Sequence, residues 1–236
     1  MLGCDFRCAY CQNWFTSQSL RDDASTIKST SVSAKDIRDR ANGARVVVPN
    51  YNEPLITSEW AVEVFKEAKQ IKLWTANVSN GHGTPEVLEY IGPWIDLMKI
   101  DLKSFSPKVY RRFGGNLNAE LETIQAVYGM GICLELVILL IPDYNESDEE
   151  LSKIAEFIAG ISKDIPWHVT AFHPDCKMAD RKRTPVETLL RAYQHGKISG
   201  LSFVYPGNLP DKVQNTENTY CPDCQNLILG LWIKSS

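Results

Sequence analysis

Short apolar segments alternate with longer amphipathic segments along most of the chain. The short segments are rich in β-branched residues and bounded by Gly, Pro or Asn, which is typical of buried strands. They predict six strands, at residues 44–48, 73–79, 95–101, 132–141, 167–172 and 201–205. The longer segments repeat apolar residues at helical spacing and predict five helices, at 58–71, 84–91, 118–129, 147–162 and 185–197.

Three of the predicted helices begin with sequence signals for an N-cap. Ser58 precedes an acidic residue, Thr84 precedes a Pro-Glu pair, and Ser147 is followed three residues later by Glu150. The last pattern is that of a capping box, in which a Ser hydroxyl and a Glu carboxylate each satisfy a free backbone N–H.

The repeated strand–helix order predicts an α/β fold. Strands joined through helices run parallel with right-handed crossovers, in either a doubly wound sheet or a (β/α) barrel. We expect residues 1–213 to form the core and residues 214–236 to form a C-terminal extension, whose CPDC turn packs on it. Only Met1 and Leu2 precede Gly3, so the first strand is expected to be truncated, which would expose a sheet edge.

Polar residues follow four of the predicted strands where each strand ends. They are Asn50–Glu53, Ser79–His82, Asp101 with Lys103, and His173. Because ligands bind at the carboxyl edge of parallel sheets, these residues are expected to line one pocket. Loops are polar in any case, so a single residue of this set carries little weight alone.

Composition and charge narrow the possible functions. The 236 residues carry a net charge of -4, with no basic footprint for nucleic acid. No apolar run approaches the roughly 20 residues that cross a bilayer, and no signal peptide begins the chain. We therefore expect a cytoplasmic protein with neither nucleic-acid nor membrane partners. Thiols stay reduced in that compartment, so grouped cysteines point to metal or redox chemistry.

Three of the seven cysteines stand at the start of the chain, in the stretch GCDFRCAYC. Cys4, Cys8 and Cys11 have the spacing C-x3-C-x2-C. Three thiolates suit a [4Fe–4S] cluster with one iron left open to a ligand. A zinc knuckle would need a fourth Cys or His at similar spacing, and three unrelated buried cysteines remain a further alternative.

The motifs along the chain resemble those of a known family. CDFRCAYC is followed in order by YNEP at 51–54, SNGHGTPE at 79–86, IDLKSFS at 100–106, WHVTAFHPD at 167–175 and NTYCPDC at 218–224. This set is similar to the radical S-adenosylmethionine (SAM) superfamily, in the branch of the pyruvate formate-lyase-activating enzymes, and most of all to the AmmeMemoRadiSam system radical SAM enzymes. The resemblance implies a partial (β/α)6 TIM-like barrel with a [4Fe–4S] cluster and SAM as cofactors.

The resemblance also implies an activity. An electron from the cluster, received from an external reductant such as flavodoxin or ferredoxin, would cleave SAM to a 5′-deoxyadenosyl radical. That radical would abstract hydrogen from a substrate that the sequence does not identify. The substrate would be either a glycine of a partner protein, as for an activase, or a small molecule or another protein.

The resemblance assigns the first set of ligand contacts to residues around the cysteines. Cys4, Cys8 and Cys11 would ligate the cluster. Tyr10 would pack near the adenine. Glu53 would hold the SAM ammonium group through a charge-assisted hydrogen bond.

The remaining assignments fall on the ends of the predicted strands. Asn52 would help to orient the ammonium group, and Asn80 would bond the ribose or the methionine portion of SAM. Asp101 and Lys103 alternate onto one face of an extended segment, where Lys103 would neutralise the SAM carboxylate. His173 would donate to SAM or to the substrate. A capping acid, a solvent-facing Asp/Lys pair and a structural histidine are the simpler alternatives.

Two other classes of protein remain open. A zinc-containing interaction module would use the three cysteines and one from the C-terminal end, and would bind no SAM. An iron–sulfur electron carrier would hold a cluster that does not respond to SAM. Cys221 and Cys224 are half of a zinc or auxiliary cluster site, or simply two thiols in a tight turn. Cys133, within an apolar strand, is expected in the core.

Overall fold

The computed structural model describes residues 2–23, 25–209, 216 and 218–230. The chain divides into two compact units. Unit 1 comprises Met1–Asp101 and Pro107–Leu134, and unit 2 comprises Leu102–Ser106 and Glu135–Ser236. The predicted boundary between core and extension, at 213/214, lies outside the described residues and stays a prediction. Within the described ranges no helix is both long and apolar enough to cross a membrane.

Unit 1 contains three parallel strands in the order β1-β2-β3. These are β1 (Val46–Val47), β2 (Trp74–Ser79) and β3 (Leu97–Asp101), with Val46 paired to Trp74 and Ala76 to Leu97. Its helices are α1 (Trp14–Ser17), α2 (Ala34–Arg40), α3 (Ser58–Gln70), α4 (Pro85–Ile91), α5 (Pro107–Arg112) and α6 (Leu117–Gly129). Short 3-10 turns cover Ser19–Arg21, Pro54–Thr57 and Gly92–Trp94.

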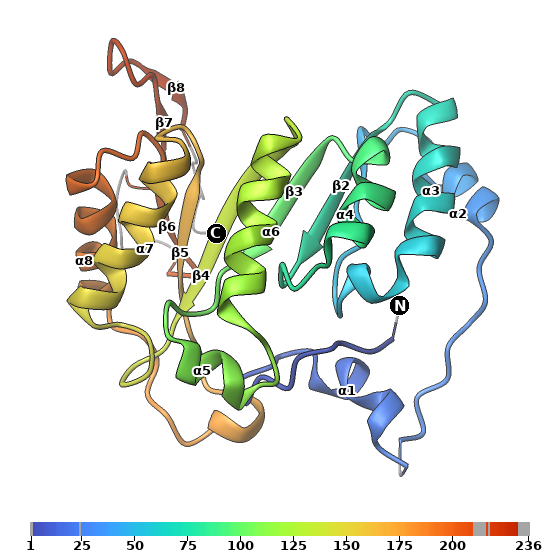
Figure 1. The fold of residues 1–236 in the computed structure, drawn as a ribbon, viewed down its shortest axis with the longest axis horizontal. Helices are drawn as coiled ribbons and strands as arrows, with labels where there is room; N and C mark the ends of the chain where they lie inside the picture. Colours follow the sequence, from blue (N-terminus) through green and yellow to red (C-terminus); the bar gives the residue numbers. More distant parts are fainter. Residues whose placement is uncertain (1, 24, 210–215, 217, 231–236) are drawn as a thin grey trace, which may run out of the picture. The chain divides into compact units, whose positions relative to one another are not determined.

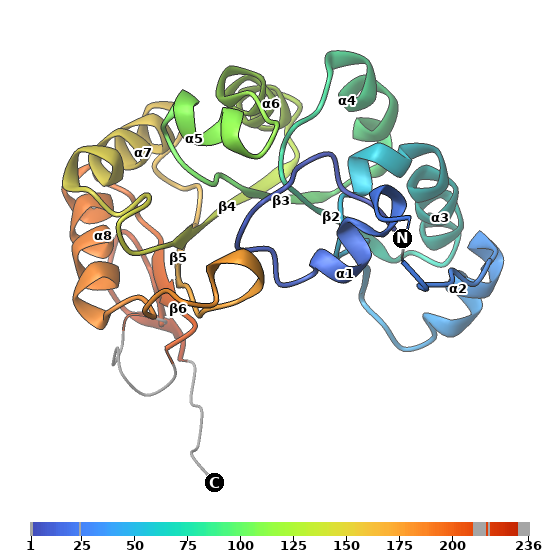
Figure 2. The same cartoon turned by 90° about the horizontal axis from the view of Figure 1, so that it is seen from below.

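The core of unit 1 lies between the strands and the long helices. Met98 and Ile100 of β3 are buried, as are Val62 and Phe65 of α3. Helix α3 packs on β2 and on α4, and α4 contacts α6. Figure 1 shows the N-terminal loop and α1 below the carboxyl ends of β2 and β3, and Figure 2, seen from that end, shows the loop in front of these strands.

Unit 2 contains the parallel strands β4 (Cys133–Leu140, beginning in unit 1), β5 (Trp167–Ala171) and β6 (Val204–Gly207), in that order. Leu136 pairs with Trp167, and Trp167 with Val204. Helices α7 (Asp148–Ile161) and α8 (Val186–Ile198) pack together, and a 3-10 turn covers Cys176–Met178. An antiparallel ribbon of β7 (Thr219–Tyr220) and β8 (Leu227–Leu229) follows.

Close packing around Trp167 fixes how α8 lies on the sheet of unit 2. The Trp167 side chain is fully buried. Gly196 of α8 lies against it, since a Cβ at this position would be 2.7 Å from Val204 Cγ2 and 3.2 Å from Trp167 Cε3. Only a residue without a side chain lets the helix approach β5 and β6 so closely.

All six predicted strands and all five predicted helices are present, which confirms the parallel α/β architecture. Two strands differ in extent. β1 is reduced to Val46–Val47, and β6 begins at Val204 because the backbone N–H groups of Leu201 and Ser202 donate instead to Gly196 O and Lys163 O. Helices α1, α2 and α5 and the β7–β8 ribbon were not predicted.

Two capping predictions and one core prediction were wrong in detail. Helix α3 has Thr57 as its N-cap, while the Ser58 hydroxyl donates to Leu55 O at 2.6 Å. Ser147 does cap α7, but the Glu150 carboxylate accepts from Phe105 N at 2.8 Å rather than closing a capping box. Cys133 is exposed because it is the first residue of β4, before the buried alternation begins.

Candidate active site at the N-terminal cysteine loop

The N-terminal loop of unit 1 is tied at both ends to the elements around it. Gly3 N donates to Thr16 O at 3.1 Å, and Glu53 N donates to Gly3 O at 3.2 Å. Gly3 has φ +94°, a left-handed conformation that suits glycine. Thr16 Oγ1 also donates to Asn52 Oδ1 at 2.9 Å. These bonds hold the loop beside residues 51–54, which follow β1.

The three cysteines of the loop are half-buried, and none of them belongs to a disulfide. Cys11 N donates to Cys8 O at 3.2 Å in a tight turn, and Cys11 Sγ lies 3.4 Å from Ser17 Oγ. Burial raises the pKa of the Cys4 thiol to about 12. The loop therefore offers three sulfur donors within eight residues.

The chemistry of the donor set fits an iron–sulfur cluster. A four-iron cube takes thiolates at separate corners, and soft sulfur donors suit it. Cys4, Cys8 and Cys11 supply these without a fourth cysteine nearby in the sequence.

A hydrogen-bond network not predicted from the sequence joins this loop to the end of β2. Asn80 Nδ2 donates to Asp5 Oδ1 at 2.7 Å and to Cys4 Sγ at 3.8 Å. His82 Nδ1 lies 2.8 Å from Asp5 Oδ2, and His82 N donates to Asn80 Oδ1 at 2.8 Å. Asp5 and His82 thus belong to the site. His82 was among the strand-end residues expected to line the pocket, whereas the only sequence signal of Asp5 was its position beside Cys4.

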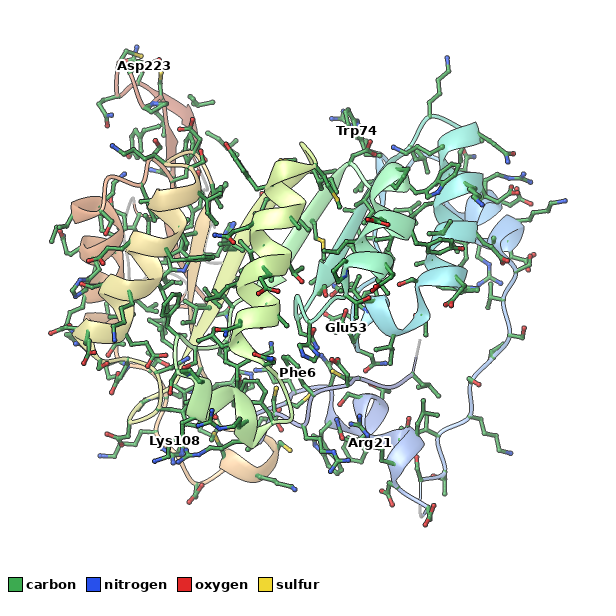
Figure 3. All side chains as sticks on the ribbon, in the orientation of Figure 1. Phe6, Arg21, Glu53, Trp74, Lys108 and Asp223 are labelled. Carbon is green, nitrogen blue, oxygen red and sulfur yellow. The ribbon has the colours of Figure 1, made fainter. Side chains whose placement is uncertain are left out.

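Aromatic side chains pack around Phe6 of the N-terminal loop. Phe6 is 1% exposed, and its ring centroid lies 5.1 Å from that of His82 and 5.0 Å from that of Phe113. Gly115 gives the ring room, because a Cβ there would be 2.6 Å from Phe6 Cε1. The label of Phe6 in Figure 3 marks this position beside the loop. Phe6, which lies between Cys4 and Cys8 in the sequence, therefore anchors the loop in the core of unit 1.

Glu53 is a buried carboxyl group surrounded by donors. Its side chain is 1% exposed, and Oε1 accepts from Leu55 N at 2.9 Å and from Ser79 Oγ at 2.7 Å. Oε2 accepts from Asn80 N at 2.7 Å. Burial outweighs these bonds and raises the pKa of Glu53 to about 7. The carboxyl group therefore fixes the turn after β2, where Asn80 begins its own contacts with the cysteine loop.

Glycine is required next to this contact. Gly81 has φ +74°, and a Cβ there would lie 2.6 Å from Ile100 Cγ2 of β3. Its N–H donates to Ser79 Oγ at 2.9 Å. The absence of a side chain at Gly81 therefore permits close packing between the end of β2 and β3.

The structure gathers most of the predicted residues in unit 1. Cys4, Cys8, Cys11, Tyr10, Asn52, Glu53, Asn80 and Asp101 all belong to it. Tyr10 is 7% exposed, and Asp101 is half-buried at the end of β3, on the same face as Lys99. Lys103 and His173 belong to unit 2, so their contribution stays a prediction. There the Lys103 carbonyl accepts from Asn145 Nδ2 at 2.9 Å, and His173 is exposed.

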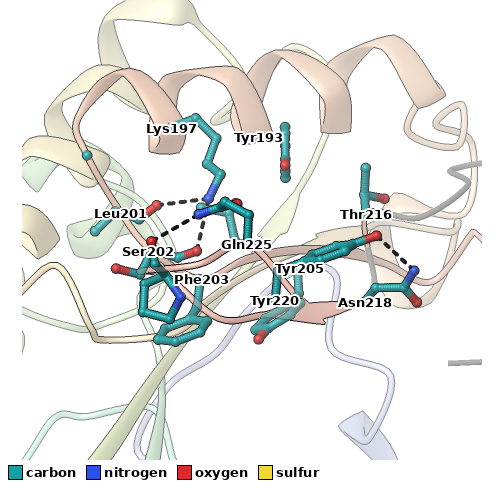
Figure 4. Close-up of a pocket in the computed structure, with 13 residues that line it drawn as sticks. Tyr193, Lys197, Leu201, Ser202, Phe203, Tyr205, Thr216, Asn218, Tyr220 and Gln225 are labelled. Atoms are coloured by element: carbon teal, nitrogen blue, oxygen red, sulfur yellow. Dashed lines mark hydrogen bonds between the residues drawn. The ribbon is translucent and has the colours of Figure 1, made fainter. Parts of the chain in front are cut away.

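Unit 2 has polar features of its own. His168 Nε2 lies 3.1 Å from Glu135 Oε2, and its ring stacks on Tyr205 with centroids 5.3 Å apart. A cavity of about 320 Å³ lies between α8, the start of β6 and the β7–β8 ribbon, and Figure 4 shows Lys197 donating to carbonyl groups at its edge. Sequence reasoning did not identify either feature.

The chain matches one protein-family model, that of the radical SAM superfamily, over residues 1–158. It is 32% identical over 232 residues to an uncharacterised protein of Methanocaldococcus jannaschii, covering 98% of this chain and 68% of the relative. It is 25% identical over 200 residues to a pyruvate formate-lyase-activating enzyme of Clostridium pasteurianum, covering 79% and 82% of the two chains.

Solved structures share the fold. A domain of a pyruvate formate-lyase-activating enzyme from Bacteroides vulgatus superposes with a TM-score of 0.61 at 20% identity, covering 68% of this chain and 98% of that one. SuiB of Streptococcus suis, solved with SAM bound, gives a TM-score of 0.67 at 14% identity and covers 87% and 48%. At such identities the likeness concerns the fold, and it agrees with the predicted partial barrel.

Proposed function

The chain belongs to the radical SAM superfamily, and on this premise we propose that it holds a [4Fe–4S] cluster through Cys4, Cys8 and Cys11 and cleaves SAM reductively. When bound, the cluster would supply the electron that converts SAM to methionine and a 5′-deoxyadenosyl radical, which takes a hydrogen atom from the substrate. The observation that carries the proposal is the three-cysteine loop, fastened to the end of β2 through Asp5 and Asn80.

The residues of the chain position the reactants and do not react themselves. The Asn80 side-chain amide donates to Cys4 Sγ, and the Asn80 backbone N–H is held by the Glu53 carboxyl group. Phe6 keeps the loop packed, and Asp5 fixes the ring of His82. A preorganised loop of this kind avoids the cost of ordering the thiols when the cluster is assembled.

We assign the SAM contacts to the residues that end the strands. Glu53 uses three of its roughly four acceptor positions on protein donors, which leaves one for the SAM ammonium group, beside Asn52. Tyr10 would border the adenine, and Asn80 the ribose or methionine portion.

Three further residues complete the proposed contacts. Asp101 would bond the ribose, and Lys103 would neutralise the carboxylate. His173 would donate to SAM or to the substrate.

The similar proteins support a general class of substrate. One relative is a pyruvate formate-lyase-activating enzyme, and a structural neighbour, SuiB, is known with a precursor peptide bound. They support a protein or peptide substrate, with an activase acting on a glycine as one form. An external carrier such as flavodoxin or ferredoxin would deliver the electron. We place this chemistry in the cytoplasm, where thiols stay reduced.

Formation of 5′-deoxyadenosine tests the proposal. The chain, reconstituted anaerobically with iron and sulfide, is mixed with dithionite and SAM, and the nucleoside is quantified. We expect 5′-deoxyadenosine from the wild-type chain and from Cys133→Ser, an exposed cysteine outside the loop, and none from Cys8→Ser. Equal nucleoside from Cys8→Ser, or none from a wild-type chain shown to carry the cluster, would reject the proposed function.

A further inference from the structure

Helix α5 packs against the N-terminal cysteine loop, and both belong to unit 1. Arg7 N of the loop donates to Phe113 O at 2.9 Å, directly after the helix ends. Phe6 of the loop meets the buried ring of Tyr110 edge-on, with ring centroids 6.2 Å apart. The helix therefore borders the loop whose three cysteines are proposed to hold the cluster.

The exposed side of α5 is positively charged. Lys108, Arg111 and Arg112 are exposed, and their spacing places them on one face of the helix. Arg7 of the loop is exposed as well. The carboxylate of Asp5, the acidic residue of the loop, is bonded to two side chains that follow β2. The surface beside the cysteines is thus cationic, although the whole chain has a net charge of -4.

Apolar side chains are exposed where the chain leaves the loop. Trp14 and Phe15 of α1 are 36% and 63% exposed, and their rings stack with centroids 3.8 Å apart. Leu20 is 70% exposed and lies beside the loop, because a Cβ at Gly3 would be 2.9 Å from Leu20 Cδ1. Exposed aromatic rings together with arginines are typical of a surface that binds another protein.

We propose that this surface docks an acidic one-electron carrier protein of the flavodoxin class, an inference that rests on the proposed function. Figure 1 shows the N-terminal loop running between α1 and α5, so the charged and the aromatic side chains flank the cysteines. We call this region the docking surface, and it consists of Arg7, Trp14, Phe15, Lys108, Arg111 and Arg112.

Position and charge both favour an electron carrier as the partner. The proposed cleavage of SAM consumes one electron, which has to reach a cluster held by the cysteine loop. In the transfer, the flavin hydroquinone of the carrier loses one electron and becomes a semiquinone, and the cluster gains that electron. Opposite charges on the two proteins would speed their encounter and fix its orientation, which suits the small, transient interfaces of redox partners.

Two triple variants with the same change of net charge test the docking surface on the full chain. The α5 variant neutralises the exposed cations of that helix and is Lys108→Gln/Arg111→Gln/Arg112→Gln. The control neutralises three exposed cations on α2 and in the segment before it, and is Lys28→Gln/Lys35→Gln/Arg40→Gln. Arg7 is kept in both, because it stands among the cysteines of the loop.

Each reconstituted chain is assayed for 5′-deoxyadenosine with two sources of electrons. One is dithionite, and the other is a bacterial flavodoxin at increasing concentration, kept reduced by NADPH and flavodoxin reductase. Binding of each chain to immobilised flavodoxin is measured separately, at about 50 and about 300 mM NaCl, since salt screens charges on an exposed surface. We expect the α5 variant to need about tenfold more flavodoxin for its half-maximal rate than wild type and control need. Dithionite should support equal rates in all three.

Flavodoxin binding should be weaker in the α5 variant and should depend less on salt than in wild type. Phe15→Ala should also weaken binding, whereas Tyr90→Ala, which removes an exposed ring from α4, should not. Equal dependence on flavodoxin in wild type and the α5 variant, or an equal loss in the control, would overturn the proposal. So would an α5 variant that also loses the dithionite reaction, because its cations would then support the cluster site.

Failure of the proposed function would give a different result. Dithionite would then yield no 5′-deoxyadenosine from any of the chains. The binding measurement would still decide the docking surface, because equal binding of flavodoxin by wild type and the α5 variant at low salt would overturn it.

Discussion

The buried carboxyl group of Glu53 should make the stability of the chain depend on pH in an unusual direction. Burial raises its pKa from 4.5 to about 7. Between these two pH values the native chain keeps a proton that the unfolded chain releases. The free energy of unfolding therefore falls as pH rises through this window, since stability falls wherever the native state binds more protons. A shift of this size corresponds to about 3 kcal/mol, at about 1.4 kcal/mol for each pH unit.

Glu53→Gln removes the titration and keeps the shape of the side chain. The amide oxygen can still accept from Leu55 N and Ser79 Oγ, while the NH2 group faces Asn80 N, a donor. That mismatch costs about 1–3 kcal/mol at every pH. The stability of wild type minus that of the variant should therefore fall by about 3 kcal/mol from pH 4.5 to above 7, whatever its starting value.

Urea unfolding followed by circular dichroism over this pH range measures the difference. Glu86→Gln is the matched control, because hydrogen bonding to Thr84 lowers the pKa of this exposed carboxyl group. The control should show no such decline through the window. A difference in stability between wild type and Glu53→Gln that stays constant, or that rises with pH, would show that the pKa of Glu53 is not raised in the folded chain. It would mean that the three donors hold Glu53 ionised in spite of its burial.

Five further substitutions test the packing and the loop. Gly81→Ala and Gly43→Ala both place a side chain at positive φ, but only the Cβ at position 81 would meet Ile100 of β3, at 2.6 Å. Gly81→Ala should therefore lower the free energy of unfolding in urea by about 1–3 kcal/mol more than Gly43→Ala does. Gly196→Ala should destabilise by about 1–3 kcal/mol, whereas Gly160→Ala, with open space in α7, should stabilise by about 0.5–1 kcal/mol. Asn80→Ala should lower the iron bound per chain after anaerobic reconstitution, with the far-ultraviolet spectrum retained; unchanged iron would show that its amide does not support Cys4.

The repeating elements were predictable because burial imposes a period on the sequence. β4 alternates buried and half-buried residues from Leu134 onward, and α3 buries one stripe that includes Val62 and Phe65. Helix α2 has no buried residue, so its sequence carries no apolar period, although Ser33 and Asp36 form a complete capping box. Elements without a buried face leave only such local signals.

The site could be predicted where the residues of a sequence motif are also the residues proposed to bind the cluster or SAM. Cys4 and Glu53 stand in recognisable stretches, and both lie at the loop or beside it. The pairing of Asp5 with His82 and Asn80 joins residues more than seventy positions apart, and no local pattern encodes such a contact. The inward position of Glu53, on donors from β2, likewise depends on the tertiary fold.

The proposed cluster leaves one iron free for SAM. The most direct test is the electron paramagnetic resonance spectrum of the reconstituted, reduced chain, recorded before and after SAM is added. We expect a cluster signal that changes when SAM binds, because one iron would gain new ligands. A cluster signal that SAM leaves untouched, or a reconstituted chain without such a signal, would contradict it.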